Sequence, residues 1–443
     1  MSKPSLRGPR GTRDYFPAEM AVRLHVEHAW RSASLRHGFE EIEGPNFEHL
    51  ELFTLKSGQE IVSELFSFRR EGGDDTYALR PEFTPTLARM VASKGSSLSR
   101  PIKWFAIPSH FRAERPQRGR VREFRQWNVD MLGLDSESAD AEVIATAIGA
   151  LASLGLGPDA IRVKVSHRDA VAKALGELGV EEDRLTAAFE LLDRRDKLDE
   201  EEFSKRATAL NLPQEALEGF DKLARTTTSI TEDLAEIAAR AGIATEALGP
   251  LEAYRDALVR AGVAEYCDWD LGIVRGLAYY TGGVFEIHDA DGTERAIAGG
   301  GRYDGLVELL GGPPTSAVGM GMGDIVLSLV LEKRGLLKEI APSPPEIFLL
   351  SAGEDGTDER MIATMHALRN AGMHARRSYK TTRNVGKLLS EAAKSGAKLA
   401  IIFGEECAQG RVVVKDLGAA SQEDVAFDDL KEHLDRLLTE QSS

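Results

Sequence analysis

Residues 111–133 read FRAERPQRGRVREFRQWNVDMLG, and the first part of this stretch, 111–126, contains six arginines and no lysine. Apolar and charged residues alternate on both sides of PQRGR, which predicts two antiparallel strands joined by a loop at 116–120. Guanidinium groups are planar, permanently charged and able to bind phosphate or carboxylate through two hydrogen bonds. The cluster therefore indicates an anionic ligand, and Phe124 offers a ring face on which a base can stack. The alternative is a solvated basic hairpin, although such a surface usually mixes lysine with glutamate.

This basic segment lies in an acidic chain. The 443 residues include 55 Lys and Arg against 71 Asp and Glu, for a net charge of −16, which disfavours indiscriminate binding to nucleic acid or membrane. The length predicts two or three domains. We find no apolar run long enough to span a bilayer and no secretory signal in MSKPSLRGPR, so we expect a soluble, cytoplasmic protein. With only Cys267 and Cys407, we expect neither a disulfide framework nor a cysteine zinc site, so any metal should arrive with a substrate.

Composition and periodicity divide the chain into segments. Residues 18–37 have an apolar stripe at helical spacing and end before Gly38, which predicts an amphipathic helix. Residues 180–265 are rich in Glu, Ala, Leu and Arg at helical spacing, and APSPPE at 341–346 is a stiff proline linker. Beyond it, strand and helix patterns alternate. We predict an α+β chain with a catalytic domain over 1–175 and 266–338, a helical insertion over 176–265, a linker over 339–346 and an α/β domain over 347–443.

Five segments together resemble a known family. Residues 111–133 resemble motif 2 of the class II aminoacyl-tRNA synthetases, in the version of the histidyl-tRNA synthetase family. RGTRDYFP (10–17), LRPEFTPTLARM (79–90), VRGLAYYTGGVFE (274–286) and AIAGGGRYDGL (296–306) resemble other motifs of that family, in the same order. The resemblance extends over nearly the whole chain. It implies the class II antiparallel-sheet catalytic domain with a helical insertion, followed by an anticodon-binding α/β domain.

The resemblance also implies a reaction and its residues. The family joins L-histidine to the histidine tRNA, using ATP with Mg²⁺, through an adenylate that forms when the amino-acid carboxylate attacks the α-phosphate. Arg112 and Arg275 would be the catalytic residues, on either side of the α-phosphate, where arginine stabilises charge on the phosphorus oxygens. Glu114 would orient the adenine amino group and Phe124 would stack on the ring. Arg120 completes the expected ATP-binding set, and no protein metal ligand is expected.

The histidine site needs a carboxylate for the α-ammonium group and polar partners for the imidazole, because an unpaired buried polar atom costs about 1–3 kcal/mol. By motif, we expect histidine to be bound by Glu82, Phe83, Thr84, Arg112, Gln126, Asp130, Arg275, Tyr279 and Tyr280. Tyr279 and Tyr280 are adjacent, so in a strand only one of them would face the ligand. The glycines at 299–301 either allow a close backbone approach beside this pocket or form a tight turn.

Two further segments concern partners. Residues 376–398 contain seven basic residues and the single acid Glu391, which indicates phosphate contacts to tRNA on the terminal domain. A solvated helix face is the alternative. GFEEIEGPNFEHLELF at 38–53 resembles class II motif 1, from which we expect a homodimer.

Two positions depart from the family pattern. Ala278 stands where the family has an acid in RGLDYYTG. SAVGMGMGDIVL at 316–327 aligns with motif 3, but Ile325 and Val326 occupy the positions of a Glu-Arg pair whose arginine binds the γ-phosphate. Asp324 is expected to cap the following helix and to repel a triphosphate.

Three interpretations follow from these departures. Arg118 and Arg120 could replace the missing phosphate ligand in an active enzyme. Alternatively, the chain is a histidine-binding paralogue without catalysis, such as the regulatory subunit of the first enzyme of histidine biosynthesis. That subunit lacks an anticodon domain, so the presence of 347–443 counts against it. A plain RNA-binding protein leaves the LRPE and YY segments unexplained.

Overall fold

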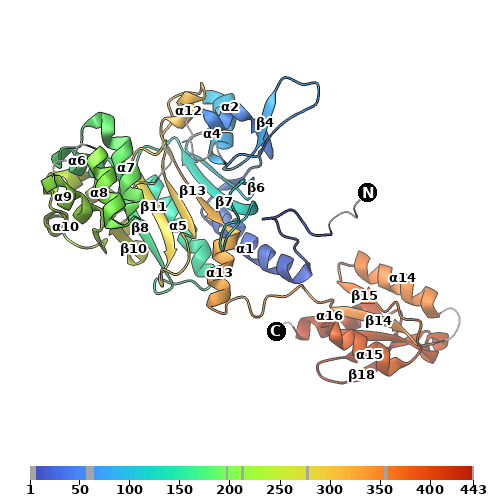
Figure 1. Cartoon of the computed structure of the whole chain (residues 1–443). Coiled ribbons are helices and arrows are strands. Elements are labelled where there is room, and N and C mark those ends of the chain that lie inside the picture. The colour runs from blue at the N-terminus through green and yellow to red at the C-terminus, as the bar shows by residue number, and fades with distance from the viewer. Residues whose placement is uncertain are drawn as a thin grey trace. The chain divides into compact units, whose positions relative to one another are not determined.

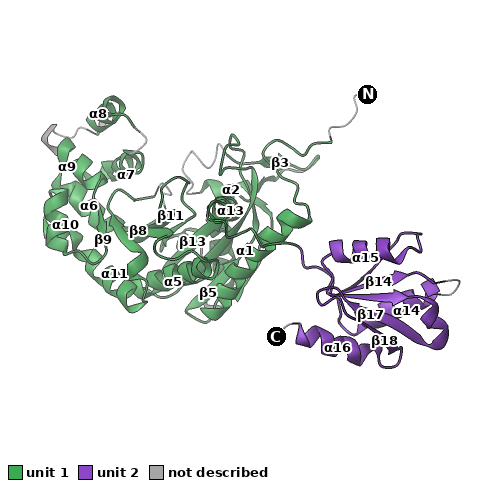
Figure 2. Cartoon of the chain, turned by 90° about the horizontal axis from the view of Figure 1, so that it is seen from below, with its two compact units in different colours: residues 1–341 green, residues 342–443 purple. Residues whose placement is uncertain are grey.

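The chain forms two compact units in a computed structural model, Met1–Ala341 and Pro342–Ser443, shown in Figure 2. The structure describes residues 6–55, 64–195, 198–210, 214–275, 279–353 and 357–441. The boundary between the units falls at the proline-rich APSPPE segment. Both units combine sheets with packed helices, which confirms the α+β class. Among the described residues, no helix is both long enough and apolar enough to cross a bilayer.

The first unit is built on one large sheet. In the described residues this sheet has ten strands, in the order β1-β5-β7-β13-β12-β11-β8-β10-β9, with β6 paired to β7. The pairs β1/β5 and β10/β8 are parallel and all others are antiparallel. The strands are β1 (Glu40–Glu41), β5 (Ile102–Ala106), β6 (Ser109–Phe111), β7 (Glu123–Leu132), β8 (Ile161–His167), β9 (Thr227–Ser229), β10 (Cys267–Asp270), β11 (Gly283–Asp289), β12 (Ala298–Arg302) and β13 (Ala317–Gly323).

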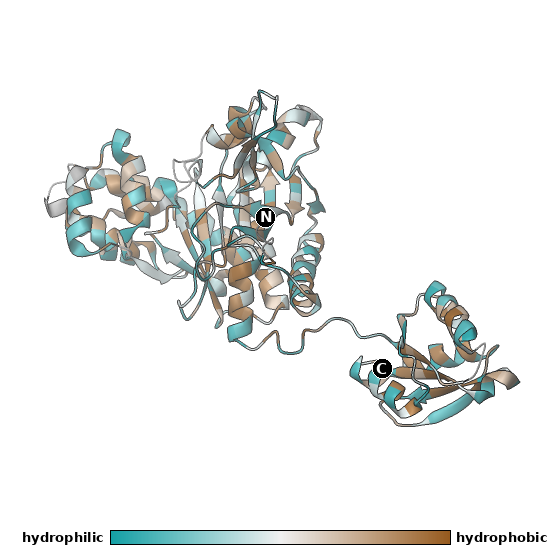
Figure 3. Ribbon diagram, turned by 45° about the vertical axis from the view of Figure 1, so that its right-hand side comes forward, coloured by the Kyte–Doolittle hydropathy of each residue, from teal (hydrophilic) through white to brown (hydrophobic). Residues whose placement is uncertain are grey.

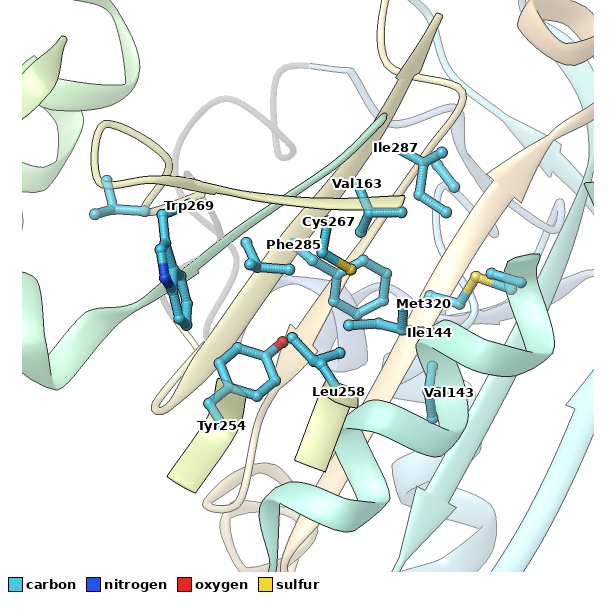
Figure 4. Packing of buried hydrophobic residues seen from close by; sticks show 14 of the residues in the cluster. Val143, Ile144, Val163, Tyr254, Leu258, Cys267, Trp269, Phe285, Ile287 and Met320 are labelled. Atoms are coloured by element: carbon cyan, nitrogen blue, oxygen red, sulfur yellow. The ribbon is translucent and has the colours of Figure 1, made fainter. Parts of the chain in front are cut away.

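One face of this sheet is covered by helices. Helix α1 (Pro17–Arg36) packs on α5 (Glu137–Ser153) and α13 (Asp324–Lys333), and α5 packs on β7 and β13 (Figure 1). Because side chains alternate along a strand, every second residue points to these helices. One of these residues on β7 is Trp127, which stacks on Trp30 of α1 with ring centroids 6.0 Å apart. In Figure 4, Phe285 and Ile287 of β11 lie on the side where Val143 and Ile144 of α5 pack.

Helix α1 begins and ends as its sequence predicts. Pro17 stands in the first turn, where its fixed φ and missing N–H are tolerated. The chain leaves the helix through Gly38, whose φ of +74° is strained for any residue with a side chain. Val26, Trp30 and Ala33 of the predicted stripe are buried. The helix is therefore fixed by one apolar stripe and a glycine stop.

Helices gather beyond the β8–β10 edge of the sheet, as Figure 1 shows. They are α6 (Arg168–Glu177), α7 (Leu185–Asp193), α8 (Glu200–Ala209), α9 (Gln214–Ala224), α10 (Leu234–Ala241) and α11 (Gly249–Arg260). Strand β9 belongs to this segment and pairs with β10, while α11 packs on α5 and β8. The helices therefore share a continuous apolar core with the sheet. Treating 176–265 as an inserted domain remains our proposal.

A small sheet of three antiparallel strands, in the order β2-β4-β3, lies apart from the large one. Its strands are β2 (Phe47–His49), β3 (Ser67–Arg69) and β4 (Thr76–Leu79), and the neighbouring helices are α2 (Leu50–Thr54), α4 (Thr84–Lys94) and α12 (Leu306–Leu309). Helix α4 packs on α2 and α12. The LRPE segment, residues 79–90, lies in this group from the end of β4 into α4.

The second unit has a sheet of five strands in its described residues, in the order β15-β14-β16-β17-β18. The strands are β14 (Ile347–Ser351), β15 (Ala375–Arg377), β16 (Leu399–Phe403), β17 (Arg411–Asp416) and β18 (Gln422–Ala426), and the helices are α14 (Thr357–Asn370), α15 (Val385–Lys394) and α16 (Leu430–Glu440). Helices α14 and α16 contribute to one apolar cluster and α15 to another. In both units, the apolar colour of Figure 3 is concentrated in the strands and the packed helices.

Candidate active site

The arginine-rich segment forms the predicted hairpin. Strands β6 and β7 are antiparallel, with His110 opposite Phe124. The loop between them is closed by hydrogen bonds between Gln117 and Arg120, and Gly119 adopts a φ of +74° at this turn. The RGTRDYFP segment lies against the loop, because the Arg122 backbone N–H donates to the Gly11 carbonyl over 2.7 Å. Two of the motif segments therefore meet at the base of this loop.

This loop borders a cavity of about 610 Å³ on the face of the large sheet opposite α1 and α5. Four arginines line it, from three separate segments, together with two glutamates: Arg112, Arg120, Arg275, Arg295, Glu114 and Glu286. The excess of positive charge suits a polyanion such as a nucleoside triphosphate. Phe124 and Gln126 of β7 also line the cavity.

Glycines form the floor of this cavity. Strand β13 alternates glycine with methionine over 319–323, and Met320 and Met322 belong to the apolar core on the other face. The strand register puts Gly321 beside Gly299 of β12, with Gly299 opposite Glu286 of β11. These positions share one face of the sheet, and at Gly299 and Gly321 no side chain covers the backbone, so ligand or protein groups can lie directly on it.

The side chain of Arg275 lies across this floor. A methyl carbon built on Gly299 would overlap its guanidinium, at 2.5 Å from Cζ. Arg275 Nη1 donates to Glu286 Oε1 over 2.8 Å, and Glu286 Oε2 lies 3.0 Å from Nε2 of His288. The glycines at 299–301 therefore serve close approach; they lie in a strand, so the tight-turn alternative is wrong. Arg275 itself has a φ of +54°, which is uncommon for a residue with a side chain.

The hairpin positions the other predicted ATP residues around the cavity. Glu114 and Arg120 form an ion pair, with Oε2 and Nη1 2.6 Å apart. The Arg112 guanidinium lies 5.3 Å from the centroid of the Phe124 ring. Burial, and then the neighbouring charge of Glu114, raise the pKa of Glu64 to about 7. Glu114 therefore has one neighbour of opposite charge, Arg120, and one neighbouring carboxyl group, Glu64, whose ionisation it disfavours.

Of the predicted histidine residues, Arg112, Gln126 and Arg275 line the cavity, whereas Glu82, Phe83, Asp130, Tyr279 and Tyr280 are buried. Glu82 is buried, and its Oε2 accepts a hydrogen bond of 2.7 Å from Tyr279. Among the described residues, Glu82 Oε1 has no hydrogen-bond partner although it is shielded from solvent. Arg112 and Arg275 are close enough to favour the charged form of Glu82, but burial outweighs them and raises its pKa. An unsatisfied carboxylate oxygen here matches the ammonium group of an amino acid.

Aromatic rings complete this buried layer. Tyr279 and Tyr280 are both buried, with ring centroids 5.1 Å apart, and they lie outside any strand. The prediction that one ring faces the ligand while the other packs behind it assumed that both residues lie in a strand. That assumption is wrong. Asp130 accepts a hydrogen bond of 2.6 Å from Tyr303, and burial raises its pKa to about 7. A methyl group on Gly319 would overlap the Asp130 carboxylate, so this acid also lies over the glycine floor.

Two members of the LRPE segment have contrasting surroundings. The Phe83 side chain is 1% exposed and belongs to an apolar cluster, with the Arg80 guanidinium 5.3 Å from its ring centroid. Its side chain therefore serves packing. Thr84 begins α4, two residues after Glu82.

The motif 3 segment differs from its expected arrangement. Asp324 does not cap α13, because the N-cap is Gly323 and no side chain caps it. Asp324 instead forms an ion pair of 2.9 Å with Arg23 and accepts from the Arg125 backbone N–H. Long-range partners outweighed the local cap. Ile325 and Val326 line the cavity, whereas Ala278 lies outside the described residues.

Sequence reasoning missed Glu286, His288 and Arg295, which all line the cavity. A signal was present for the first two, because FEIH alternates apolar and polar residues, as expected for a strand with one polar face. Arg295 lies in the loop before β12, where no periodicity marks its direction.

A second surface lies in the second unit. A groove of about 840 Å³ is lined by Tyr379, Lys380, Lys387 and polar residues of 381–390. Tyr379 is 75% exposed, and the Arg377 guanidinium lies 4.3 Å from its ring centroid. An exposed ring among basic residues is typical of surfaces that bind single-stranded nucleic acid.

The largely antiparallel sheet, the arginine hairpin and the glycine floor define a class II aminoacyl-tRNA synthetase. Comparison with known families narrows this class. Residues 11–323 match the family model described as histidyl-tRNA synthetase, and residues 347–437 match the one described as anticodon binding domain. The chain therefore belongs to the histidyl-tRNA synthetase family.

Individual relatives agree with this assignment. A histidine–tRNA ligase of Opitutus terrae is 38% identical over 421 residues, which cover 94% of both chains. One from Halobacterium salinarum is 39% identical and covers 93% of this chain and 94% of its own. The crystal structure of histidyl-tRNA synthetase from Nostoc sp. PCC 7120 has the same fold, with a TM-score of 0.76 at 23% identity, over 98% of this chain and 100% of that one.

Proposed function

We propose that this chain is a histidine–tRNA ligase, which activates L-histidine with ATP and transfers it to the histidine tRNA. The observation that carries the proposal is that Arg112 and Arg275, from distant segments, line one cavity with a glycine floor. Both charges act on the buried Glu82, whose Oε1 has no hydrogen-bond partner in the part of the chain that the structure describes. Membership of the family agrees with this chemistry. The arrangement offers one site for a triphosphate and an adjacent site for an amino acid.

In the first step, an oxygen of the histidine carboxylate attacks the α-phosphorus of ATP as the bond to pyrophosphate breaks, which leaves histidyl-adenylate. We assign Arg112 and Arg275 to the α-phosphate oxygens, where charge accumulates in the transition state. The Glu286 carboxylate, 2.8 Å from Arg275, holds that guanidinium in place. Phe124 is assigned to the adenine ring, and Glu114 with its partner Arg120 to the base and phosphates. In the second step, a ribose hydroxyl at the tRNA 3′ end attacks the histidyl carbonyl and AMP leaves.

We assign the buried layer to histidine. Glu82 Oε1 suits the α-ammonium group, because it is buried and lacks a partner within the described residues. Gln126, Asp130 and Tyr280 are assigned to the imidazole, which needs a partner for each ring nitrogen. Thr84 and Tyr279 support Glu82, and Phe83 supports the site through packing and its backbone.

We assign tRNA recognition to both units. The groove at 379–390 is suited to anticodon nucleotides, since it combines an exposed ring with lysines. Basic residues of 376–398 that are exposed, such as Arg376, Arg383 and Lys394, would contact phosphates. The hairpin loop would meet the acceptor end.

We also propose a homodimer. Phe47 and Phe68 of the small sheet are 47% and 43% exposed and pack edge to face, with ring centroids 5.7 Å apart. Phe47 lies in the motif 1-like segment, and exposed aromatic clusters of this kind mark protein interfaces. Mg²⁺ would enter bound to the ATP phosphates; the described residues include no cluster of three or more His, Cys, Asp or Glu side chains that could hold a metal. A cytoplasmic location, where charged tRNA is used, completes the proposal.

Histidine-dependent exchange of pyrophosphate into ATP tests this function. The full chain should incorporate labelled pyrophosphate into ATP only with histidine, and should then charge the histidine tRNA. A regulatory paralogue would bind histidine without exchange, and a plain RNA-binding protein would do neither. The match of 347–437 to an anticodon binding domain counts against the regulatory subunit, which lacks that domain. Absence of exchange at saturating histidine and ATP would refute the ligase.

A further inference from the structure

The cavity has an apolar wall where the resemblance implies a phosphate ligand. Ile325 and Val326 are 6% and 9% exposed and line the cavity at the start of α13. An apolar wall offers no hydrogen bond to a phosphate oxygen, so a charged group from another element must provide that contact if ATP binds well.

The hairpin arginines have other partners. Arg118 is directed to solvent, with its side chain 70% exposed, and its Nη2 lies 2.5 Å from Glu294 Oε1. It is not among the residues that line the cavity. Arg120 lines the cavity but is paired with Glu114. The hypothesis that Arg118 replaces the missing ligand is therefore disfavoured by its position.

Arg295 has the required position. It lies in the loop between β11 and β12 and lines the same cavity as Val326. A methyl carbon built on Gly119 would lie 3.7 Å from Arg295 Cδ and 3.5 Å from Val326 Cγ2, so both side chains reach the same point beneath the hairpin loop. An arginine here can therefore cover the end of the cavity that the motif 3 residues leave apolar.

Arg295 also carries a charge that no carboxylate pairs with in the described part of the chain, although the nearby charges of Glu114 and Glu286 partly offset those of Arg120 and Arg112. Within the described residues it has no hydrogen bond or ion pair, while the adjacent Glu294 is occupied by Arg118. Partial burial, followed by the nearby charge of Arg120, lowers the pKa of Arg295. Arginine remains protonated despite such a shift, so the free enzyme holds like charges close together. An anionic ligand would relieve that repulsion.

We propose that Arg295 binds the terminal phosphates of ATP in place of the arginine that the family has at position 326. This inference rests on the proposed function, because it names a further residue of the same nucleotide site. Arg295 would contact the β- and γ-phosphates and then the pyrophosphate that leaves, whereas Arg112 and Arg275 act at the α-phosphate.

Nucleotide binding separates this role from a general one. We would measure the affinities of AMP and of a non-hydrolysable ATP analogue, both with Mg²⁺, for the full chain and its variants. Arg295→Ala should weaken the analogue by about ten- to a hundredfold, the scale of one charge-assisted contact, and leave AMP within about threefold. Arg295→Lys should retain part of the preference for the triphosphate. Because Arg295 is an exposed loop residue, neither change should lower the thermal midpoint appreciably.

Two further variants serve as comparisons. Arg240→Ala removes an exposed arginine from the helical segment and controls for net charge. Arg118→Ala tests the competing ligand directly. If Arg118→Ala abolishes the triphosphate preference, or Arg295→Ala weakens AMP and the analogue equally, the proposal for Arg295 is wrong. It is also wrong if Arg295→Ala affects only the transfer to tRNA.

The exchange reaction separates a failure of the Arg295 proposal from a failure of the ligase function. In an active enzyme, Arg295→Ala should raise the KM for ATP with little change in the KM for histidine. Wild-type protein without histidine-dependent exchange would refute the ligase function, yet the comparison of AMP with the analogue would still decide whether Arg295 binds phosphates. An unchanged KM for ATP in Arg295→Ala, with a fully active wild type, would refute Arg295 alone.

Discussion

Replacing Gly299 with alanine should disable the enzyme without unfolding it. The new methyl carbon would lie 2.5 Å from Cζ of Arg275, whereas carbon atoms in contact lie about 3.5–4.0 Å apart, so the guanidinium must move by about 1 Å or more. The movement would break its 2.8 Å contact with Glu286. Since a misplacement of about 1 Å can reduce a rate about a hundredfold, kcat for exchange should fall by about that factor.

The fold should survive this change because the displaced atoms are the end of a side chain. Gly299 lies in β12 and does not have a positive φ, so alanine fits the backbone. Gly305→Ala is a matched control, since no atom lies within 4 Å of the added carbon. Thermal unfolding of both variants, beside exchange assays, separates a local effect from a global one.

A double mutant makes this reasoning refutable. Once Arg275 is alanine, the methyl group on residue 299 has no guanidinium to displace, so the second change should cost no more than about twofold. If Gly299→Ala alone exchanges within threefold of wild type, or if the two effects multiply, the glycine does not act through Arg275.

Arg275→Ala should slow adenylate formation by about 10²–10³-fold and leave histidine binding largely intact; pyrophosphate exchange rates within threefold of wild type would remove Arg275 from the mechanism. A chain that ends at Pro342 keeps the whole first unit, so it should bind histidine and, if dimeric, form the adenylate, but lose most of its tRNA affinity; equal tRNA binding at physiological salt by filter assay would make the basic segment a solvated face. Burial raises the pKa of Asp130 from 3.8 to about 7, so its contribution to stability is present at low pH and lost as pH rises to about 7. Asp130→Asn should therefore gain stability relative to wild type between pH 5 and 7, on the order of a few kcal/mol at most, with no further change above pH 8; a pH-independent difference in the free energy of unfolding would contradict this.

Local sequence patterns determined several secondary-structure elements of this protein and the boundary between its two units. The apolar stripe of α1 and Gly38 set one helix, since helix periodicity and a glycine stop depend only on neighbouring residues. The alternation around PQRGR predicted the β6–β7 hairpin for the same reason, and the proline segment marked the boundary between the units. The motif segments identified the family, which the comparisons confirm.

Tertiary structure decided how the motifs form a site. The alternation of glycine and methionine at 319–323 shows that the glycines share one face, but only the register with β12 and β7 sets which groups lie over them. Asp324 follows a glycine at a helix start, yet its partner is Arg23, which is distant in sequence. Tyr279 and Tyr280 both point into one buried layer because they lie outside a strand.

Arg295 shows why the sequence alone did not reveal every residue of the site. Nothing in its immediate sequence indicates a ligand, because a loop residue has no periodicity and its direction depends on packing. Its place beside Val326 and Gly119 results from pairing between β11, β12 and β13 and from the fold of the hairpin loop. A sequence pattern records which residues share a face of one strand or helix. Which faces meet, and which charges are left without a partner there, depends on contacts between segments far apart along the chain.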